Sequence, residues 1–283
     1  MITRRQFICG LAGGVVAGGA GLIYVRRIEP RWLTVSRIRV PLDRTGQSIA
    51  PVRVLQLSDL HLSPEVSLEY IAESVDLGLS TQPDVIVLTG DFFTGPAQTV
   101  SKYADVLRRL SAAAPTFACL GNHDGGQWSR ARGGLESADA VVNMLGEAGI
   151  ACLINEGREV RVHGRTIQLI GVGDFWSGLC KPDTAFANVP ARGDAVRLLL
   201  NHNPDAKVML RSHDWDLMLC GHTHGGQLRL PLIGAPYAPV RDKRYIHGLH
   251  SWENRWLHIT SGVGNLHGVR FNCRPEVTVL TLV

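Results

Sequence analysis

Short apolar runs recur along the chain, and most have the length and composition of buried strands. Residues 52–57 and 85–88 are runs of valine, isoleucine and leucine with few polar interruptions, which is typical of strands covered on both faces. Between such runs lie longer segments whose apolar residues recur every three or four positions, which predicts amphipathic helices. The expected strands are 35–40, 52–57, 85–88, 116–120, 151–154, 159–162, 166–172, 197–200, 217–220, 256–260 and 277–282, and the expected helices are 68–80, 100–110 and 141–148.

The order of these elements changes near residue 151. Strands alternate with helices before it, and short strands follow one another after it. Alternation followed by a strand-rich half predicts an α/β fold with layers around central sheets and functional loops where the strands end. The length of residues 31–283 suits one large domain, or two tightly fused halves, with a sizeable core.

The first 30 residues do not follow this pattern. Arg4 and Arg5 precede a weakly apolar run rich in glycine and alanine, residues 8–25, which a second arginine pair closes. This order predicts a twin-arginine signal read by the twin-arginine export machinery. The alternative is an N-terminal membrane anchor, since at ~1.5 Å per residue the run could just cross a hydrocarbon core of ~30 Å. Either interpretation predicts a protein that is periplasmic, or membrane-anchored and facing outside the cytoplasm.

Charge and cysteine content exclude some classes of function. The formal net charge is only +4, to which the four arginines of the N-terminal segment contribute, so we expect no nucleic-acid binding. The six cysteines show no Cys-x-x-Cys spacing of a zinc or redox site. The sequence gives no indication of the oligomeric state.

Metal-binding side chains directly follow five of the apolar runs. They are Asp59 with His61, Asp91, Asn122 with His123, His202, and His222 with His224. Each alone has an ordinary explanation, such as a cap or a turn, but their recurrence after strands favours one shared metal site. The set exceeds what one tetrahedral zinc needs. It suits two divalent ions about 3.5–4 Å apart, bridged by a carboxylate and a hydroxide.

The same motifs carry a family resemblance. The ordered set resembles the signature of the calcineurin-like metallophosphoesterases through Asp59-x-His61, Gly90-Asp91, Gly121-Asn122-His123-Asp124, His202 and Gly221-His222-Thr223-His224. The resemblance implies a four-layer α/β/β/α sandwich with two central mixed β-sheets, formed by residues 31–283 as a single catalytic domain. It further implies one ion held by Asp59, His61, Asp91 and His224, and a second held by Asp91, Asn122, His202 and His222. The family often has Asp or Asn three residues after the bridging aspartate, where this chain has Thr94, so one contact that supports a ligand is in question.

The implied activity is metal-dependent phosphodiester hydrolysis. A hydroxide held between two ions would attack phosphorus in line, and His123 would protonate the departing alkoxide. Asp124 would orient His123 and favour its charged form. Other interpretations of His123 are a third-site ligand and a loop histidine. The mixed ligand set suits manganese first, and also admits iron, zinc or nickel.

The substrate is less well specified than the reaction. Glycine-rich residues 125–134 follow the His123 motif, and there we expect a mobile rim where Arg130 and Arg132 meet phosphate, with Trp176 lining the mouth; a solvated loop is the alternative. A small or lipid-linked phosphodiester is the expected substrate. One alternative function is a UDP-2,3-diacylglucosamine-type pyrophosphohydrolase at the membrane. The other is a non-catalytic, metal-stabilised interaction module, which would need neither His123 nor a complete ligand set.

Overall fold

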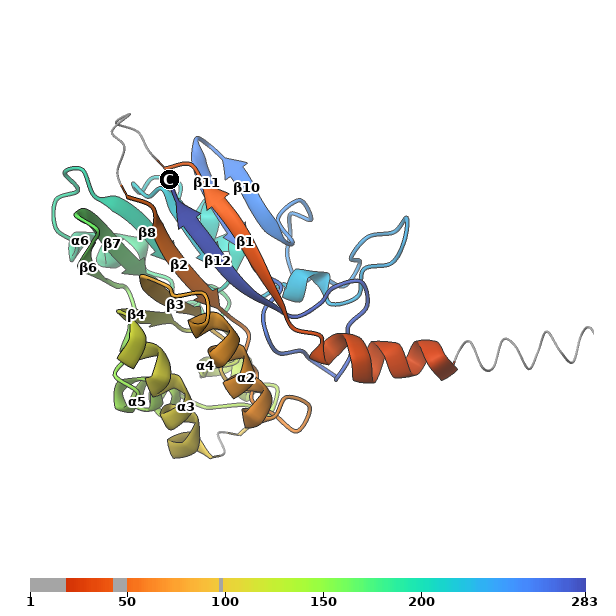
Figure 1. Ribbon diagram of the computed structural model, residues 1–283. Helices are drawn as coiled ribbons and strands as arrows, with labels where there is room; N and C mark the ends of the chain where they lie inside the picture. The colour runs from red at the N-terminus through yellow and green to blue at the C-terminus, as the bar shows by residue number, and fades with distance from the viewer. Residues whose placement is uncertain (1–18, 43–49, 97–98) are drawn as a thin grey trace, which may run out of the picture.

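Two six-stranded mixed sheets packed face to face form the centre of the molecule (Figure 1). The computed structural model describes residues 19–42, 50–96 and 99–283. The first sheet has the strand order β1-β12-β2-β3-β4-β5, and the second has the order β10-β11-β9-β8-β7-β6. The strands are β1 (Thr34–Val40), β2 (Val52–Leu57), β3 (Val85–Thr89), β4 (Thr116–Cys119), β5 (Ala151–Cys152), β6 (Glu156–Val162), β7 (Arg165–Gly171), β8 (Val196–Leu200), β9 (Leu217–Cys220), β10 (Gly248–Trp252), β11 (Arg255–Ile259) and β12 (Glu276–Leu282).

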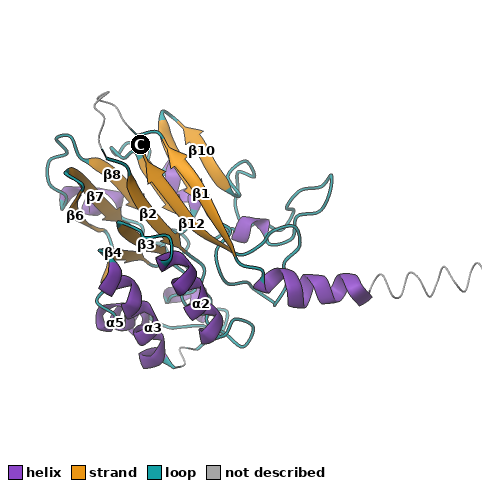
Figure 2. Ribbon diagram, viewed as in Figure 1, coloured by secondary structure: helices purple, strands orange, loops and turns teal. Residues whose placement is uncertain are grey.

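Helices cover the outer face of each sheet, which completes four layers. Three amphipathic helices, α2 (Leu68–Leu79), α3 (Val100–Ala113) and α5 (Asp139–Glu147), lie on the first sheet (Figure 2). The outer layer of the second sheet is thinner and contains α6 (Pro182–Ala187) and the 3₁₀ turn η3 (Pro204–Val208). The predicted α/β/β/α sandwich is therefore confirmed.

Burial on both faces explains the continuous apolar runs of the central strands. Along β2, Leu55 and Leu57 pack towards the helices, whereas Val54 packs between the sheets. Leu198 of β8 and Leu219 of β9 enter the same inter-sheet core from the other side. Because successive side chains of a strand point to opposite faces, both sets of positions must be apolar.

One buried polar network crosses between the sheets close to the strand ends. The Gln56 side-chain amide donates to Thr89 Oγ1 at 3.0 Å and to the carbonyl of Cys220 at 3.0 Å. His258 Nδ1 lies 2.8 Å from Gln56 Oε1. A buried amide is stable only when its hydrogen bonds are made, so these contacts fix the register between the sheets where the functional loops begin.

Two short elements and one loop differ from the sequence-based expectation. The sequence pattern did not predict β10 or α6. β10 is joined to β11 by a two-residue turn in which Glu253 and Asn254 both have positive φ, 48° and 62°, the geometry of a type I′ hairpin. The expected mobile rim at 125–134 begins with a short helix instead, α4 (Gly126–Arg130). Hydrogen bonds to the flanking loop hold it, since the Gly126 amide donates to the Glu136 carbonyl at 3.1 Å and the Ser129 hydroxyl to the His123 carbonyl at 3.0 Å.

The N-terminal segment is attached to the two-sheet fold. Helical residues 19–23 continue into η1 (Tyr24–Ile28) and η2 (Glu29–Arg31). The Val25 carbonyl accepts a 3.0 Å hydrogen bond from the Arg270 amide, and the fully buried Glu29 carboxylate accepts one from the Cys273 amide. The folded unit therefore begins before residue 31, and the twin-arginine pair lies outside the described residues. None of the helices in the described part of the chain combines the length and apolar character needed to cross a bilayer.

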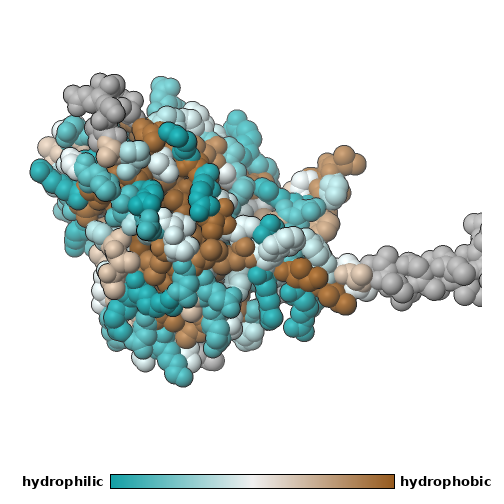
Figure 3. Space-filling model, viewed as in Figure 1, coloured by the Kyte–Doolittle hydropathy of each residue, from teal (hydrophilic) through white to brown (hydrophobic). Residues whose placement is uncertain are grey.

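In the view of Figure 3, apolar side chains lie over the centre of the visible face and also on two parts that project from it, the N-terminal helix and one loop. Leu22 and Ile23 lie on the N-terminal helix, and Leu232 and Ile233 lie at the tip of a projecting loop. Polar side chains surround the apolar area at the centre of this face.

Candidate metal centre

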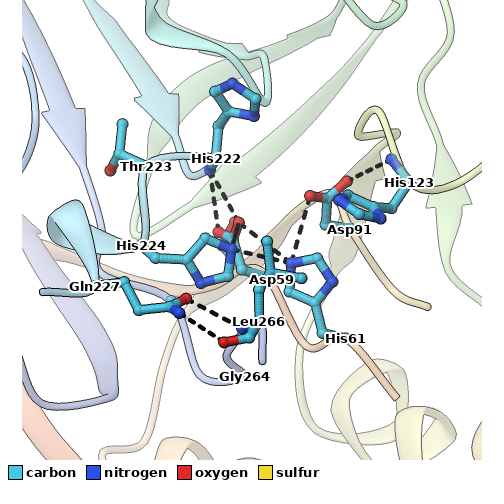
Figure 4. Close-up of polar contacts among 12 residues, drawn as sticks. Asp59, His61, Asp91, His123, His222, Thr223, His224, Gln227, Gly264 and Leu266 are labelled. Carbon is cyan, nitrogen blue, oxygen red and sulfur yellow. Dashed lines mark hydrogen bonds and ion pairs between the residues drawn. The ribbon is translucent and has the colours of Figure 1, made fainter. Parts of the chain in front are cut away.

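The candidate ligands converge from the ends of five strands. Asp59 and His61 follow β2, Asp91 follows β3 and Asn122 follows β4 in the first sheet, while His202 follows β8 and the His222–His224 loop follows β9 in the second. β2, β3 and β4 are mutually parallel, as are β8 and β9. Equivalent strand ends therefore lie at one edge of each sheet, and packing the two sheets together brings the two edges into contact (Figure 4).

Two groups of donor atoms adjoin each other in this cluster. One group comprises Asp59, His61 and His224, and the other comprises Asp91, His202 and His222, with the ligand atoms in each group lying within 4.8 Å of one another. Asp91 Oδ2 is 3.0 Å from His202 Nε2 and 3.5 Å from His61 Nε2. The Asp91 carboxylate therefore stands between the two groups, where a bridging ligand would be required.

Orphaned acceptor atoms show that the cluster fits a cation. Asn122 Oδ1 is buried and makes no hydrogen bond to any described residue, and the buried His202 Nε2 faces the Asp91 carboxylate at 3.0 Å. His61 Nε2 and His224 Nε2 face each other at 3.1 Å. Buried acceptors that point at one another without donors are costly. Since imidazole nitrogens and carboxylate oxygens are ligands for divalent transition metals, two such ions would satisfy the set.

Hydrogen bonds on the outer side of the histidines fix which nitrogen faces the centre. His202 Nδ1 lies 2.7 Å from the Thr89 carbonyl, and His222 Nε2 lies 3.1 Å from the Pro239 carbonyl. His61 Nδ1 lies 2.6 Å from Thr94 Oγ1. Because a carbonyl only accepts, the outer nitrogens of His202 and His222 carry a proton, and the Thr94 hydroxyl can accept one from His61 Nδ1 in the same way; the inner nitrogen is then the one available to a metal. The sequence analysis questioned whether Thr94, in place of Asp or Asn, could support a ligand. The Thr94 hydroxyl does contact His61 Nδ1.

Burial sets the protonation states of the ligands. It lowers the pKa values of His61 and His222 to about 3, so both rings are neutral near pH 7. For Asp91, burial opposes ionisation, but the neighbouring His202 holds the pKa well below its usual range. Burial acts to lower the pKa of His202, but the adjacent Asp91 carboxylate raises it to about 10. In the metal-free protein, a proton is therefore held between these two residues. Metal binding would release that proton.

The ligand loops contain backbone strain. Five of the candidate ligands adopt positive φ values between 47° and 70°, namely Asp59, His61, Asp91, His222 and His224. This region is sparsely populated by residues other than glycine, and such conformations cluster at functional sites. Hydrogen bonds between loops offset the strain: the Asp59 amide donates to the Gly90 carbonyl at 2.9 Å, the His61 amide to the Asp91 carbonyl at 3.0 Å, and the His222 amide to Asp59 Oδ1 at 3.0 Å.

Glycines permit the close approach of these loops. A Cβ atom on Gly121 would lie 2.2 Å from Asp91 Oδ1, and one on Gly221 would lie 2.2 Å from Asp59 Oδ2. Both distances are far below van der Waals contact. The glycines that precede Asn122 and His222 therefore have a steric function, since any side chain there would collide with a candidate ligand.

Asp124 has partners other than the expected one. Its two carboxylate oxygens accept hydrogen bonds from the backbone amides of Asp91 at 2.8 Å, Phe92 at 2.7 Å and Gly121 at 2.7 Å. We expected this side chain to orient His123, but the structure directs it to the backbone instead. Because it binds the amide of Asp91, Asp124 positions the candidate bridging carboxylate.

His123 lies beside the donor cluster at the start of an aromatic wall. Its ring centroid is 4.9 Å from that of His61 and 4.7 Å from that of Trp128. Trp128 lies 5.4 Å from Trp176, and Trp176 lies 4.3 Å from the ligand His222. Burial lowers the pKa of His123. We call Trp128 and Trp176 the aromatic wall. It borders the site from His123 to His222, a candidate ligand in the second donor group.

The predicted substrate-binding residues do not all lie at this wall. Trp176 is part of it, and the Arg132 guanidinium stacks on Trp128 at 4.0 Å. Arg130 is exposed, and its side chain lies 3.9 Å from the Glu136 carboxylate. The structure therefore brings Trp176 and Arg132 to the site, and it pairs Arg130 with an acidic residue at the surface.

A loop that the sequence analysis did not identify supports Asp59. A Cβ atom on Gly262 would lie 2.7 Å from Asp59 Cβ, and the Gly264 amide donates to the Asp59 carbonyl at 2.7 Å. The buried Arg270 side chain holds this loop through the carbonyls of Ser261 and Gly262, at 2.8 and 3.2 Å. The Gly-x-Gly sequence directly after an apolar strand could have revealed it.

Comparison with known proteins identifies relatives along the full chain. A family model described as calcineurin-like phosphoesterase matches residues 52–226, a range that contains all candidate metal ligands. Phosphodiesterase YaeI of Escherichia coli is 44% identical over 285 residues, covering 100% of both chains. The uncharacterized metallophosphoesterase YkuE of Bacillus subtilis is 29% identical and covers 99% of this chain and 98% of its own. The UDP-2,3-diacylglucosamine pyrophosphatase LpxG of Chlamydia trachomatis is 26% identical, with coverages of 91% and 92%.

The contact between Thr94 and His61 leads to a prediction about metal affinity. Thr94→Val removes the acceptor of the His61 ring proton while keeping the shape of the side chain, so affinity for one divalent ion should fall about 10–100-fold. Competition with a chelating dye measures this affinity. Thr94→Ser retains the hydroxyl and is the matched control. Equal affinities for the valine and serine variants would show that this contact does not support the ligand.

Proposed function

The chain belongs to the calcineurin-like phosphoesterase family, and we propose that it hydrolyses phosphodiesters with two divalent metal ions as cofactors. The observation that carries this proposal is the single buried cluster in which Asp91 stands between two groups of donors. A cluster with so many converging acceptors serves no evident structural purpose without cations. The similarity of the full chain to a phosphodiesterase supports the reaction class.

The chain provides two sets of residues for two ions, and the sets share Asp91. One site would use Asp59, His61, Asp91 and His224, and the other would use Asp91, Asn122, His202 and His222. When bound, the ions would lower the pKa of water towards neutrality and offset the negative charge of the phosphate. Asn122 contributes a neutral oxygen, which limits the net negative charge of the ligand set. We propose manganese as the metal, since imidazole and carboxylate ligands suit it, with iron, zinc or nickel as alternatives.

His123 is the proposed proton donor to the departing alkoxide. Its side chain lies next to the donor cluster, against the rings of His61 and Trp128. Burial lowers its pKa, and a negatively charged phosphate bound beside it would oppose this effect and favour the imidazolium. The His123 amide donates to Asp91 Oδ1 at 2.9 Å, so the backbone of the proton donor is fixed relative to the bridging carboxylate.

The aromatic wall indicates the kind of group that accompanies the phosphate. Trp176 is partly exposed and rests on His222, and Trp128 carries the Arg132 guanidinium. An apolar or planar group could pack on the indoles while Arg132 contacts an oxygen of the diester. We therefore propose a small or lipid-linked phosphodiester as the substrate. The similarity to a UDP-2,3-diacylglucosamine pyrophosphatase, over 91% of this chain, supports the lipid-linked kind of substrate.

We further propose export by the twin-arginine route and a location outside the cytoplasm, in the periplasm or at the membrane. The sequence feature behind this proposal is the Arg4-Arg5 pair followed by an apolar run. The contacts of Val25 and Glu29 with the catalytic fold support retention of at least the end of this segment in the mature protein.

Removal and restoration of metal test the proposed activity. The metal-stripped protein should not hydrolyse bis-p-nitrophenyl phosphate, and added manganese should restore turnover because the donor cluster then binds its cations. A parallel assay with UDP-2,3-diacylglucosamine compares the two substrate classes. Much faster turnover of the acyl-sugar nucleotide would assign the protein to lipid metabolism. Absence of turnover with metal bound would instead favour a metal-stabilised interaction module.

Two substitutions separate the proton donor from the ligands. His123→Ala should retain both metals but reduce kcat by about 10²–10⁴-fold, the range typical of lost general acid catalysis. Asp91→Ala should lose metal and activity together, because it removes the bridging carboxylate. Elemental analysis of the purified variants measures metal content. If both variants lost metal equally, His123 would be a ligand and not the acid, a possibility that its position within 4.8 Å of His61 and Asp91 makes worth testing.

Replacement of the arginine pair tests the export proposal. Arg4→Lys with Arg5→Lys should keep the protein in the cytoplasm, since the twin-arginine machinery reads the pair itself and not its charge. Cell fractionation of the producing bacterium measures the distribution. An unchanged distribution would contradict the export route and leave the catalytic proposal intact.

A further inference from the structure

A hairpin with an exposed apolar tip projects from the ligand loop. The Leu230 and Gly234 backbones pair through hydrogen bonds of 2.8 and 2.9 Å, which close the tip over residues 231–233. Leu232 is fully exposed and Ile233 is 69% exposed. Single exposed apolar residues are common. Two adjacent large aliphatic side chains at a protruding tip are not, because folding removes little of their apolar surface from water. We call residues 228–238 the apolar hairpin.

The N-terminal helix presents a second apolar patch on the same side of the molecule. Leu22 and Ile23 are 59% and 58% exposed, and Ile28 is 49% exposed. In Figure 1 the helix and the apolar hairpin both extend to the right of the sheets, and in Figure 3 both carry exposed hydrophobic side chains there. The sequence that leads into the helix, residues 8–18, is itself weakly apolar.

One short segment, residues 270–273, ties the two patches together. The Arg270 amide donates to the Val25 carbonyl of the helix at 3.0 Å. On the other side, the Arg229 amide donates to the Phe271 carbonyl at 2.8 Å, and the Asn272 side chain donates to the Arg229 carbonyl at 3.2 Å. Since the same segment binds both elements, the helix and the apolar hairpin form one connected surface.

The residues around these patches are those found where proteins meet lipid headgroups. Trp32 is half exposed, with the Arg274 guanidinium stacked on its ring at 4.0 Å, and Tyr237 is 75% exposed. Arg26, Arg27 and Arg31 line one side of a cavity of about 480 Å³ at the base of the helix, and the glutamates Glu65, Glu69 and Glu73 also line it. Tryptophan and tyrosine are enriched at membrane interfaces, and basic residues beside apolar segments bind anionic lipids.

We propose that the N-terminal helix and the apolar hairpin together dock on an anionic phospholipid bilayer, with Leu232 and Ile233 inserted at the interface. The hairpin begins only four residues after the ligand His224, and Ala235 packs so closely on Gly226 that a Cβ atom there would lie 2.2 Å away. Docking therefore fixes the metal centre at the membrane surface, within reach of phosphodiesters in the lipid headgroup layer. The proposal concerns where the protein sits and holds whichever diester it cleaves.

An environment-sensitive dye at the tip tests the insertion directly. The full chain carries Cys9→Ser and Leu232→Cys, labelled with a nitrobenzoxadiazole dye, and the control carries Cys9→Ser and Val208→Cys at an exposed apolar site outside the proposed surface. Among the described residues the native cysteines are free and buried, apart from the half-buried Cys152, so the labelled Cys9→Ser parent gives the background. Vesicles of phosphatidylcholine with phosphatidylglycerol should shift the emission at position 232 to the blue and leave position 208 unchanged. Position 232 remaining in water while the protein is vesicle-bound would overturn the proposal.

Paired serine substitutions measure how much the tip contributes to docking. Leu232→Ser with Ile233→Ser should weaken vesicle partitioning of the full chain by about tenfold or more, since burial of two large aliphatic side chains is lost. Val208→Ser with Met209→Ser should leave it unchanged. Hydrolysis of a soluble diester should be the same in both variants, which checks folding and separates this proposal from the proposed activity.

Two further outcomes would overturn the docking proposal. Partitioning of the tip variant equal to that of the unsubstituted chain would show that the hairpin does not contact lipid. A dye at position 232 already shielded without vesicles, together with a smaller mass of the tip variant in size-exclusion chromatography, would show that a second copy of the chain covers the hairpin.

Discussion

The Asp91 carboxylate is the group on which the arrangement of the site depends. One oxygen accepts the amide proton of His123 at 2.9 Å, and the other faces His202 and His61 at 3.0 and 3.5 Å. Its own amide donates to Asp124, which also holds the loop after β4. A single buried anion thus connects loops from both sheets. Because a buried charge must be compensated, the surrounding residues are arranged to provide partners for it and for the cations it would bridge.

Two packed sheets supply what a single sheet could not. The first sheet contributes both aspartates and the second contributes three of the four ligand histidines, so neither sheet alone forms a complete site. The Gln56 network fixes the two sheets relative to each other near the site. The strained ligand loops and their close glycines then depend on this fixed geometry. Such strain persists only where the surrounding structure determines it, and here hydrogen bonds between the loops do so.

The metal centre is connected through the chain to the proposed membrane-docking surface. The loop that carries His222 and His224 continues into the apolar hairpin, and the segment that pairs with this hairpin also binds the N-terminal helix. Ligand loop, hairpin and helix are therefore one continuous structural unit. In a membrane-docked protein, this continuity would orient the site relative to the bilayer without a separate targeting domain.

The sequence by itself determined the strands, the main helices and the residue types of the metal centre. Strands such as 52–57 were predictable because burial on both faces leaves a continuous apolar run, and the ligands because polar side chains follow those runs directly. The tertiary structure alone decided the partners of Asp124, the contact between Thr94 and His61, and the attachment of Glu29 to Cys273, which lies 244 positions further along the chain. β10 was likewise decided by its pairing with β11, and α4 by hydrogen bonds to the loop around it. Local patterns record which face of an element is buried, whereas the partner of a polar group depends on segments distant in sequence, and only folding brings those together.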